Sequence, residues 1–249
     1  DPQTHEFLLS GSGQLHVEIA LARMKRRSNV EVILHPPKVP YRETIKKVAE
    51  GQGKYKKQTG GHGQYGDVWL RLEPASEYGF EWRITGGVIP SKYQEAIEEG
   101  IKEAAKKGVL AGFPVMGFKA IVYNGSYHEV DSSDLAFQIA ASLAFKKVMA
   151  EAHPVLLEPI YRLKVLVPQE RVGDVLSDLQ ARRGRILGME QEGALSVVHA
   201  EVPLAEVLEY YKALPGLTGG AGAYTLEFSH YAEVPPHLAQ RIVQERAQE

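Results

Sequence analysis

Two glycine-bearing polar segments carry the side chains best suited to chemistry in this chain. Residues 58–66 read QTGGHGQYG, and residues 123–134 read YNGSYHEVDSSD. Imidazole, amide and hydroxyl groups bond well to phosphates, 2′-hydroxyls and bases, and glycine lets a backbone turn sharply and approach a ligand closely. From the residues alone we predict an RNA-binding tip, and a loose hairpin without a ligand stays open as the simpler alternative.

The first segment also contains a motif of nucleotide-binding proteins. Gly61, Gly63 and Gly66 have the spacing G-x-G-x-x-G, which occurs in dinucleotide sites and, with Val68, in the glycine loop of kinases. A dinucleotide site needs a helix after this motif, but an alternating, strand-like segment follows here. The kinase motifs H-R-D and D-F-G, a Walker A motif and a G-x-S-x-G elbow are all absent. We therefore expect this chain itself not to be an enzyme.

Metal binding and thiol chemistry find little support in the sequence. His128, Glu129 and Asp131 do not have the spacing H-E-x-x-H, and no second histidine lies near them. A carboxylate stabilises a helix N-terminus, which explains Asp131 and Asp134 more simply. The chain has no cysteine, which excludes disulfides, thiolate zinc sites and cysteine nucleophiles. We expect neither a metal nor a cofactor in this chain.

The charge distribution predicts local rather than surface-wide contact with nucleic acid. The formal net charge is −2, whereas a protein that grips nucleic acid over its whole surface is basic. Residues 38–67 hold seven Lys or Arg against three Asp or Glu, and Arg182, Arg183 and Arg185 form a second cluster. Either cluster is equally consistent with an ordinary solvated face.

Several features of the sequence bear on the cellular compartment of the protein. No apolar run reaches the roughly 18 residues of a membrane span, and no secretory signal is visible at the start. The absence of cysteine fits a reducing compartment. We expect a cytoplasmic protein without a membrane partner. The chain opens in mid-pattern at Asp1, which we interpret as the sign of a fragment.

Hydrophobic periodicity divides the chain into regions of mixed α+β character. Residues 1–37 read strand, helix, strand, with strands expected over 5–10 and 30–34, which is a partial βαβ segment. Residues 38–157 hold alternating strands and two helices, the second capped by Asp131 or Ser132. Residues 158–235 follow the order βαββαβ, which predicts a ferredoxin-like sandwich. Residues 236–249 form a charged tail.

Six segments together resemble bacterial elongation factor G or a paralogue of it. They are GSGQLHVE at 11–18, YRET at 41–44, the glycine-rich segment 58–66, GGVIP at 86–90, the polar segment 127–134, and LQARRGRILGM at 179–189. The resemblance implies the end of domain III in residues 1–37, a domain IV of the ribosomal-protein-S5-like α+β fold in 38–157, and a ferredoxin-like domain V in 158–235.

The resemblance also implies a function and partners. The family promotes tRNA–mRNA translocation on the ribosome, with GTP and magnesium bound by an N-terminal part that would precede this chain, and we expect a monomer. Arg182, Arg183 and Arg185 would contact rRNA. The tip that engages the codon–anticodon helix at the decoding site would contain Gly60, Gly61, His62, Gly63, Gln64, Tyr65, Asn124, Gly125, Ser126, Tyr127 and His128.

Some positions depart from the family pattern. Ser12 stands where the family usually has Met, and Gln14 where it has Glu. Ala221 replaces a cationic residue of the family, so it cannot make the same contact. These differences favour a paralogue, and a role in ribosome recycling or rescue is therefore an alternative to translocation. A generic RNA-binding module without ribosomal work is the other alternative.

Overall fold

The computed structural model describes residues 1, 4–11, 14–58 and 60–248. It contains two compact units: residues 1–40 with 158–232, and residues 41–157 with 233–249. Strand β6 (Pro154–Pro168) contributes residues to both units. The two polar segments of interest both belong to the second unit, so one folded body positions them.

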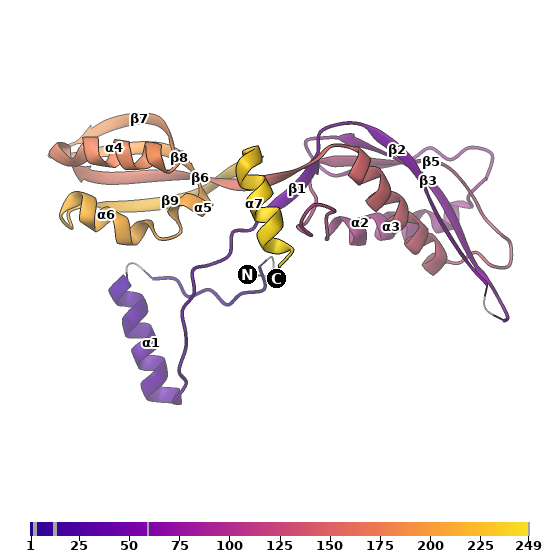
Figure 1. Cartoon of the computed structure of the whole chain (residues 1–249), viewed down its shortest axis with the longest axis horizontal. Coiled ribbons are helices and arrows are strands. Elements are labelled where there is room, and N and C mark those ends of the chain that lie inside the picture. The colour runs from indigo at the N-terminus through magenta and orange to yellow at the C-terminus, as the bar shows by residue number, and fades with distance from the viewer. Residues whose placement is uncertain (2–3, 12–13, 59, 249) are drawn as a thin grey trace. The chain divides into compact units, whose positions relative to one another are not determined.

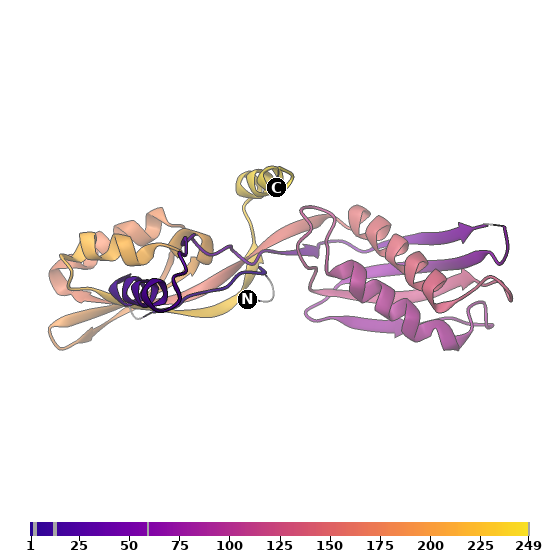
Figure 2. The ribbon, with the colours of Figure 1, turned by 90° about the horizontal axis from the view of Figure 1, so that it is seen from below.

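A four-stranded sheet with the order β2-β3-β5-β4 forms the base of this second unit. The pairs β2–β3 and β3–β5 are antiparallel, and β4 runs parallel to β5. Two helices, α2 and α3, lie side by side over one face of the sheet (Figure 2). The elements are β2 (Ala49–Lys57), β3 (Gln64–Pro74), β4 (Gly79–Trp82), α2 (Gln94–Ala105), β5 (Phe118–Ser126) and α3 (Asp134–Glu151).

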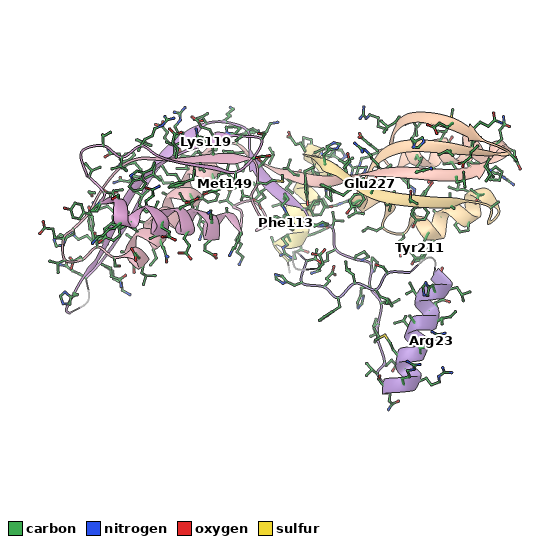
Figure 3. All side chains as sticks on the ribbon, turned by 180° about the vertical axis from the view of Figure 1, so that it is seen from behind. Arg23, Phe113, Lys119, Met149, Tyr211 and Glu227 are labelled. Atoms are coloured by element: carbon green, nitrogen blue, oxygen red, sulfur yellow. The ribbon has the colours of Figure 1, made fainter. Side chains whose placement is uncertain are left out.

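The core of this unit lies between the sheet and its helices. Val68, Leu70 and Leu72 alternate along β3 and are fully buried, which confirms the predicted strand. Met149 of α3 is buried in the same core, whereas Lys119 of β5 pairs with a glutamate of β4 outside it (Figure 3). Side chains along the strands of this sheet therefore alternate between the core under α3 and the opposite face of the sheet.

Two glycines allow α3 to lie directly on the hairpin of β2 and β3. A Cβ atom added at Gly53 would lie 2.2 Å from the carbonyl oxygen of Ala140, and one at Gly66 would lie 2.5 Å from that of Ala136. These separations are far too short for any side chain, so the sheet and the helix backbone pack at the distance that only glycine permits. The start of α3 is thus held close to the end of the hairpin (Figure 1).

The unit of residues 1–40 and 158–232 contains the predicted βαββαβ order. Its sheet runs β9-β6-β8-β7, the arrangement of a ferredoxin-like sandwich. Leu163, Val165, Val198 and Leu179 are buried between strands and helices. The elements after β6 are α4 (Val172–Ala181), β7 (Arg185–Glu192), β8 (Leu195–Pro203), α5 (Leu204–Val207), α6 (Tyr210–Thr218) and β9 (Ala223–Glu233).

The strands expected over 5–10 and 30–34 do not form. In this region the structure has helix α1 (Gln14–Ser28), and both flanking segments lack strand pairing. Alternating apolar residues form a strand only beside a hydrogen-bonded partner, and no described segment supplies one. Ser12 and Gly13, within the predicted turn before α1, lie outside the described residues.

The charged tail forms helix α7 (Pro236–Arg246) and belongs to the unit of residues 41–157. The guanidinium carbon of Arg246 lies 5.4 Å from the ring centroid of Phe113, a cation–π distance. In the same unit, β1 (Arg42–Ile45) pairs antiparallel with the first residues of β6. The C-terminal helix therefore packs on the domain that carries the polar segments.

We predict that Tyr210→Phe stabilises the ferredoxin-like unit. The hydroxyl of Tyr210 is buried and has no hydrogen-bond partner among the described residues, so its removal should raise the free energy of unfolding by about 1 kcal/mol. Burial raises the pKa of Tyr210 to about 12. Between pH 10 and 12 the unfolded chain loses this proton first, so the wild type loses more stability there than the variant, which lacks this group.

Urea unfolding of both proteins at pH 9 and pH 11 tests this. Tyr78 and Tyr224, whose pKa values burial also raises, are present in both proteins, so the difference isolates Tyr210. The advantage of the variant should be larger at pH 11. An equal difference at the two pH values would contradict the assignment.

Candidate functional site: a tip built from two loops

Two loops meet at one end of the unit that contains β2, β3 and β5. The first tip loop, residues 58–63, joins β2 to β3, and the second tip loop, residues 127–133, joins β5 to α3. Antiparallel pairing brings these strand ends to the same edge of the sheet (Figure 1). Residue 59, within the first loop, lies outside the described residues.

Hydrogen bonds of Asp131 and Ser132 hold the second tip loop to the β2–β3 hairpin. The amide of Gly63 donates to Oδ1 of Asp131 at 3.0 Å, and the amide of Tyr65 donates to the carbonyl oxygen of Asp131 at 2.9 Å. The Ser132 hydroxyl donates to the carbonyl oxygen of Tyr65 at 2.8 Å. A Cβ atom at Gly63 would lie 2.9 Å from the Asp131 carboxylate, so a side chain there would push this carboxylate away from its present position.

The second tip loop also fixes the ring of His128. Its Nδ1 accepts from the amides of Asp131 at 3.2 Å and Val130 at 3.3 Å, which assigns the proton of the neutral imidazole to Nε2. The amide of His128 donates to the Ser132 hydroxyl at 2.9 Å. With 56% of its side chain exposed, His128 presents Nε2–H to solvent as a hydrogen-bond donor.

The predicted tip residues fall into two groups. Exposed and available to a ligand are Gly60, Gly61, His62, Asn124, Tyr127 and His128. Half-buried are Gly63, Gln64, Tyr65, Gly125 and Ser126. Gly125 belongs to the second group because a Cβ there would lie 2.2 Å from the carbonyl oxygen of Asp67. Its glycine serves the packing of two strands rather than the approach of a ligand.

Three lysines give the hairpin end its positive charge. Lys54, Lys56 and Lys57 are exposed on β2, and Nζ of Lys54 lies 5.4 Å from the ring centroid of Tyr65. Another basic residue of the range 38–67, Lys46, lies outside β2 and pairs with Glu233 at 3.1 Å. The hairpin end therefore combines exposed cations with hydrogen-bond donors, a pairing suited to a phosphate backbone.

Two residues of the second loop act differently from the sequence prediction. The cap of α3 is Ser133, whose hydroxyl accepts from the amide of Ala136 at 3.1 Å, and not Asp131 or Ser132 as expected. The Asp131 and Ser132 side chains instead bond to Gly63 and Tyr65 of the β2–β3 hairpin. An Asp before a helix is a common N-cap, so the local sequence did not indicate that Asp131 bonds to Gly63 of the other loop. Within the described ranges, no three His, Cys, Asp or Glu side chains gather as a metal site.

All three candidate rRNA-binding arginines form ion pairs inside their own unit, and Arg183 is the most engaged. It makes two bonds to the carboxylate of Glu158, at 2.7 and 2.9 Å, and one to Glu206 at 3.0 Å. Glu158 has only 4% of its side chain exposed, and its hydrogen bonds raise the pKa of Arg183 above the ordinary value. Arg183 therefore compensates a buried carboxylate.

The other two arginines differ in exposure. Arg182 donates to Asp178 at 2.8 Å and to the carbonyl oxygen of Glu206 at 2.8 Å, so it links α4 to α5. Arg185 bonds to Glu201 at 2.6 Å but keeps 72% of its side chain exposed. Of the three, Arg185 is the one best placed to reach a phosphate. Contact of any of them with rRNA stays a prediction.

Comparison with known proteins gives a consistent result along the chain. Residues 1–36 match the family model for elongation factor G, domain III, residues 37–153 the model for domain IV, and residues 155–242 the model for the elongation factor G C-terminus. The chain belongs to the elongation factor G family. The three matches follow one another from residue 1 to residue 242.

Individual members of the elongation factor G family are about half identical to this chain. Elongation factor G of Aquifex pyrophilus is 51% identical over 249 residues, which are 99% of this chain and 36% of that protein. Elongation factor G of Thermotoga maritima is 50% identical over 248 residues, with 98% and 36% covered. An elongation factor G-like protein of the same organism is 49% identical over 253 residues, with 100% and 37% covered.

A solved structure is much more similar. The crystal structure of a protein from Thermus thermophilus has a TM-score of 0.92 and 91% identity, and the match covers 99% of this chain and 37% of that chain. This chain thus spans little more than a third of the length of the elongation factor G proteins it matches. Among the described residues, no helix is both long and apolar enough to cross a membrane.

The arginines of the elongation factor G C-terminal region give a prediction that separates stability from binding. Arg183→Met should lower the free energy of unfolding by about 3 kcal/mol, because it leaves the buried Glu158 carboxylate without a partner. Arg185→Met should lower the free energy of unfolding by no more than about 1 kcal/mol, because Arg185 is exposed, and the predicted rRNA contact implies weaker binding to ribosomes. Urea unfolding and a ribosome-binding assay check both. A larger stability loss for Arg185→Met would contradict this division.

Proposed function

We propose that this chain supplies the ribosome-binding portion of a translational GTPase that promotes tRNA–mRNA translocation. In this proposal the two tip loops engage the codon–anticodon helix at the decoding site. The observation that carries the proposal is that two polar loops, far apart in sequence, are bonded through Asp131 into one exposed tip. The names of the relatives point to the same process, since several are called elongation factor G.

The chemistry of the tip suits a factor that acts on every codon. His128 offers a fixed Nε2–H donor, and exposed Asn124 and Tyr127 add amide and hydroxyl groups. Donors of this kind can bond phosphates and 2′-hydroxyls, which are the same for every sequence. The tip would occupy the space to which a tRNA could return, and replace ribosomal contacts to the mRNA–tRNA helix while that helix moves.

The proposal extends to the rest of the protein. Residues 1–37 would be the end of domain III, residues 38–157 domain IV and residues 158–235 domain V, and residues 236–249 a C-terminal tail. GTP and magnesium would be bound by an N-terminal part that precedes this chain, and this chain would bind no cofactor. The protein would act as a cytoplasmic monomer whose partners are rRNA and the tRNA–mRNA duplex.

A specialised role in ribosome recycling or rescue is the second candidate. Two described positions favour it, because Gln14 and Ala221 stand where the family usually has Glu and a cation. The elongation factor G-like protein of Thermotoga maritima is as similar to this chain as the elongation factor G of that organism, at 49% against 50% identity. Activity of the complete protein in single-round translocation against ribosome splitting distinguishes the two roles.

The first test of the proposal is His128→Ala in the complete protein. Loss of one hydrogen bond to the moving helix, about 1.4 kcal/mol, should slow single-round translocation about tenfold, while ribosome-dependent GTP hydrolysis persists. His237→Ala is the matched control, because His237 is exposed on α7 outside the tip. Equal loss of translocation and GTP hydrolysis in His128→Ala would count against a role at the decoding site.

The second test concerns the lysines of the hairpin end. Replacing Lys54, Lys56 and Lys57 with Gln should weaken ribosome binding and lower the slope of log affinity against log salt by about 0.7 for each phosphate that is no longer neutralised. A generic RNA-binding module would lose affinity equally for free RNA and for ribosomes. A loss confined to ribosomes supports the proposal, and an equal loss for both contradicts it.

A further inference from the structure

We infer that Asp67 is a positioning residue for the tip, acting through a chain of side chains that spans three strands. This inference rests on the proposed function, since it concerns how the same tip is held. Asp67 lies on β3 and is only 6% exposed. A buried carboxylate is unfavourable unless its oxygens are hydrogen-bonded, so the groups that bond to Asp67 identify what it does.

Both oxygens of Asp67 accept hydrogen bonds from neighbouring strands. Nε2 of Gln52, on β2, donates to Oδ1 at 2.7 Å. The hydroxyl of Ser126, the last residue of β5, donates to Oδ2 at 2.6 Å. The carboxylate thus ties β2, β3 and β5 together at the register where Asp67 and Ser126 face each other, immediately before the second tip loop begins.

The direction of the next hydrogen bond follows from the first. The oxygen atoms of Tyr65 and Ser126 lie 2.7 Å apart, and either could be the donor on distance alone. Ser126 has one hydroxyl hydrogen, and it points to Asp67, an acceptor. The Tyr65 hydroxyl must therefore donate to Ser126. The order is Tyr65 to Ser126 to Asp67, so removal of the carboxylate frees the Ser126 hydroxyl, which then no longer offers the Tyr65 hydroxyl a fixed acceptor.

Tyr65 connects this chain of hydroxyl groups to the second tip loop. Its amide and carbonyl oxygen bond to Asp131 and Ser132 of the second tip loop, and its ring lies 6.4 Å from the ring of His128. A rotation of the Tyr65 side chain would therefore change the ring contact with His128 next to the backbone bonds that hold the loop. Asp67 fixes that rotation from within the sheet, although it touches neither the loop nor any ligand of the tip.

The test begins with amide hydrogen exchange of the 249-residue chain. Asp67→Ala should speed exchange in residues 127–132 at least about tenfold, while the amides of residues 70–72 in the sheet core stay protected. Asp67→Asn, which keeps the shape and one acceptor oxygen, should have a smaller effect. Glu73→Ala is the matched control: Glu73 lies on the same strand and bonds to Arg71 at 2.7 Å, away from the tip, and should leave residues 127–132 unchanged.

A double-mutant cycle with Tyr65→Phe separates positioning from simple loss of stability. Once the carboxylate is gone, removing the Tyr65 hydroxyl should add little, so the two effects on exchange are strongly non-additive. Tyr65→Phe alone keeps the ring and should fold in any case. Additive effects, equal acceleration in the sheet core, or unchanged exchange in residues 127–132 would each overturn the inference.

Translocation by the complete protein then connects the inference to function. Asp67→Ala should slow single-round translocation and leave ribosome-dependent GTP hydrolysis unchanged, with partial recovery in Asp67→Asn. Faster exchange together with normal translocation in both Asp67→Ala and His128→Ala would refute the proposed function and support the positioning role. Unchanged exchange in Asp67→Ala with slow translocation in His128→Ala would refute the positioning role alone.

Discussion

The tip depends on the contact between Tyr65 and the second tip loop. The Tyr65 amide donates to the Asp131 carbonyl oxygen, the Ser132 hydroxyl donates to the Tyr65 carbonyl oxygen, and a third bond, from the Gly63 amide to the Asp131 carboxylate, fixes the adjacent turn. These bonds hold two loops whose conformations the sheet alone would leave undetermined. The close packing of α3 on Gly53 and Gly66 supplies the support, because it sets where the second loop must end.

The ferredoxin-like region was predictable because its signals are local. Alternation in β6 and β8 and helical spacing in α4 appear directly in the sequence, and short connections leave few topologies. The same reasoning failed for residues 5–10 and 30–34, where the alternation is present but no described strand lies beside it. A segment forms a strand only when a second segment lies beside it and shares hydrogen bonds. An alternating pattern in one segment therefore predicts a strand only when the fold also supplies that partner.

The site was predictable in position but not in its internal contacts. Glycine and polar residues identified both loops, since exposed turns need those residue types. The sequence could not show that Tyr65 and Ser126 face inward, or that Asp131 reaches Gly63 across 68 residues of chain. The arginines illustrate the same limit, because Arg182, Arg183 and Arg185 look alike in sequence, and their different roles follow from the acids placed beside them by the fold.

The position of Asp67 and Asp131 beside the proposed RNA-binding tip has a physical explanation. A free carboxylate would repel phosphate groups, yet Asp67 and Asp131 both lie within the tip region. Each accepts hydrogen bonds, from Gln52 and Ser126 or from Gly63, and Asp67 is almost fully buried. Their charge is directed at donors inside the unit, while Lys54, Lys56 and Lys57 remain exposed. The two acids can therefore stiffen the loops, and the exposed charges near the tip include these three lysines and Glu129 of the second tip loop.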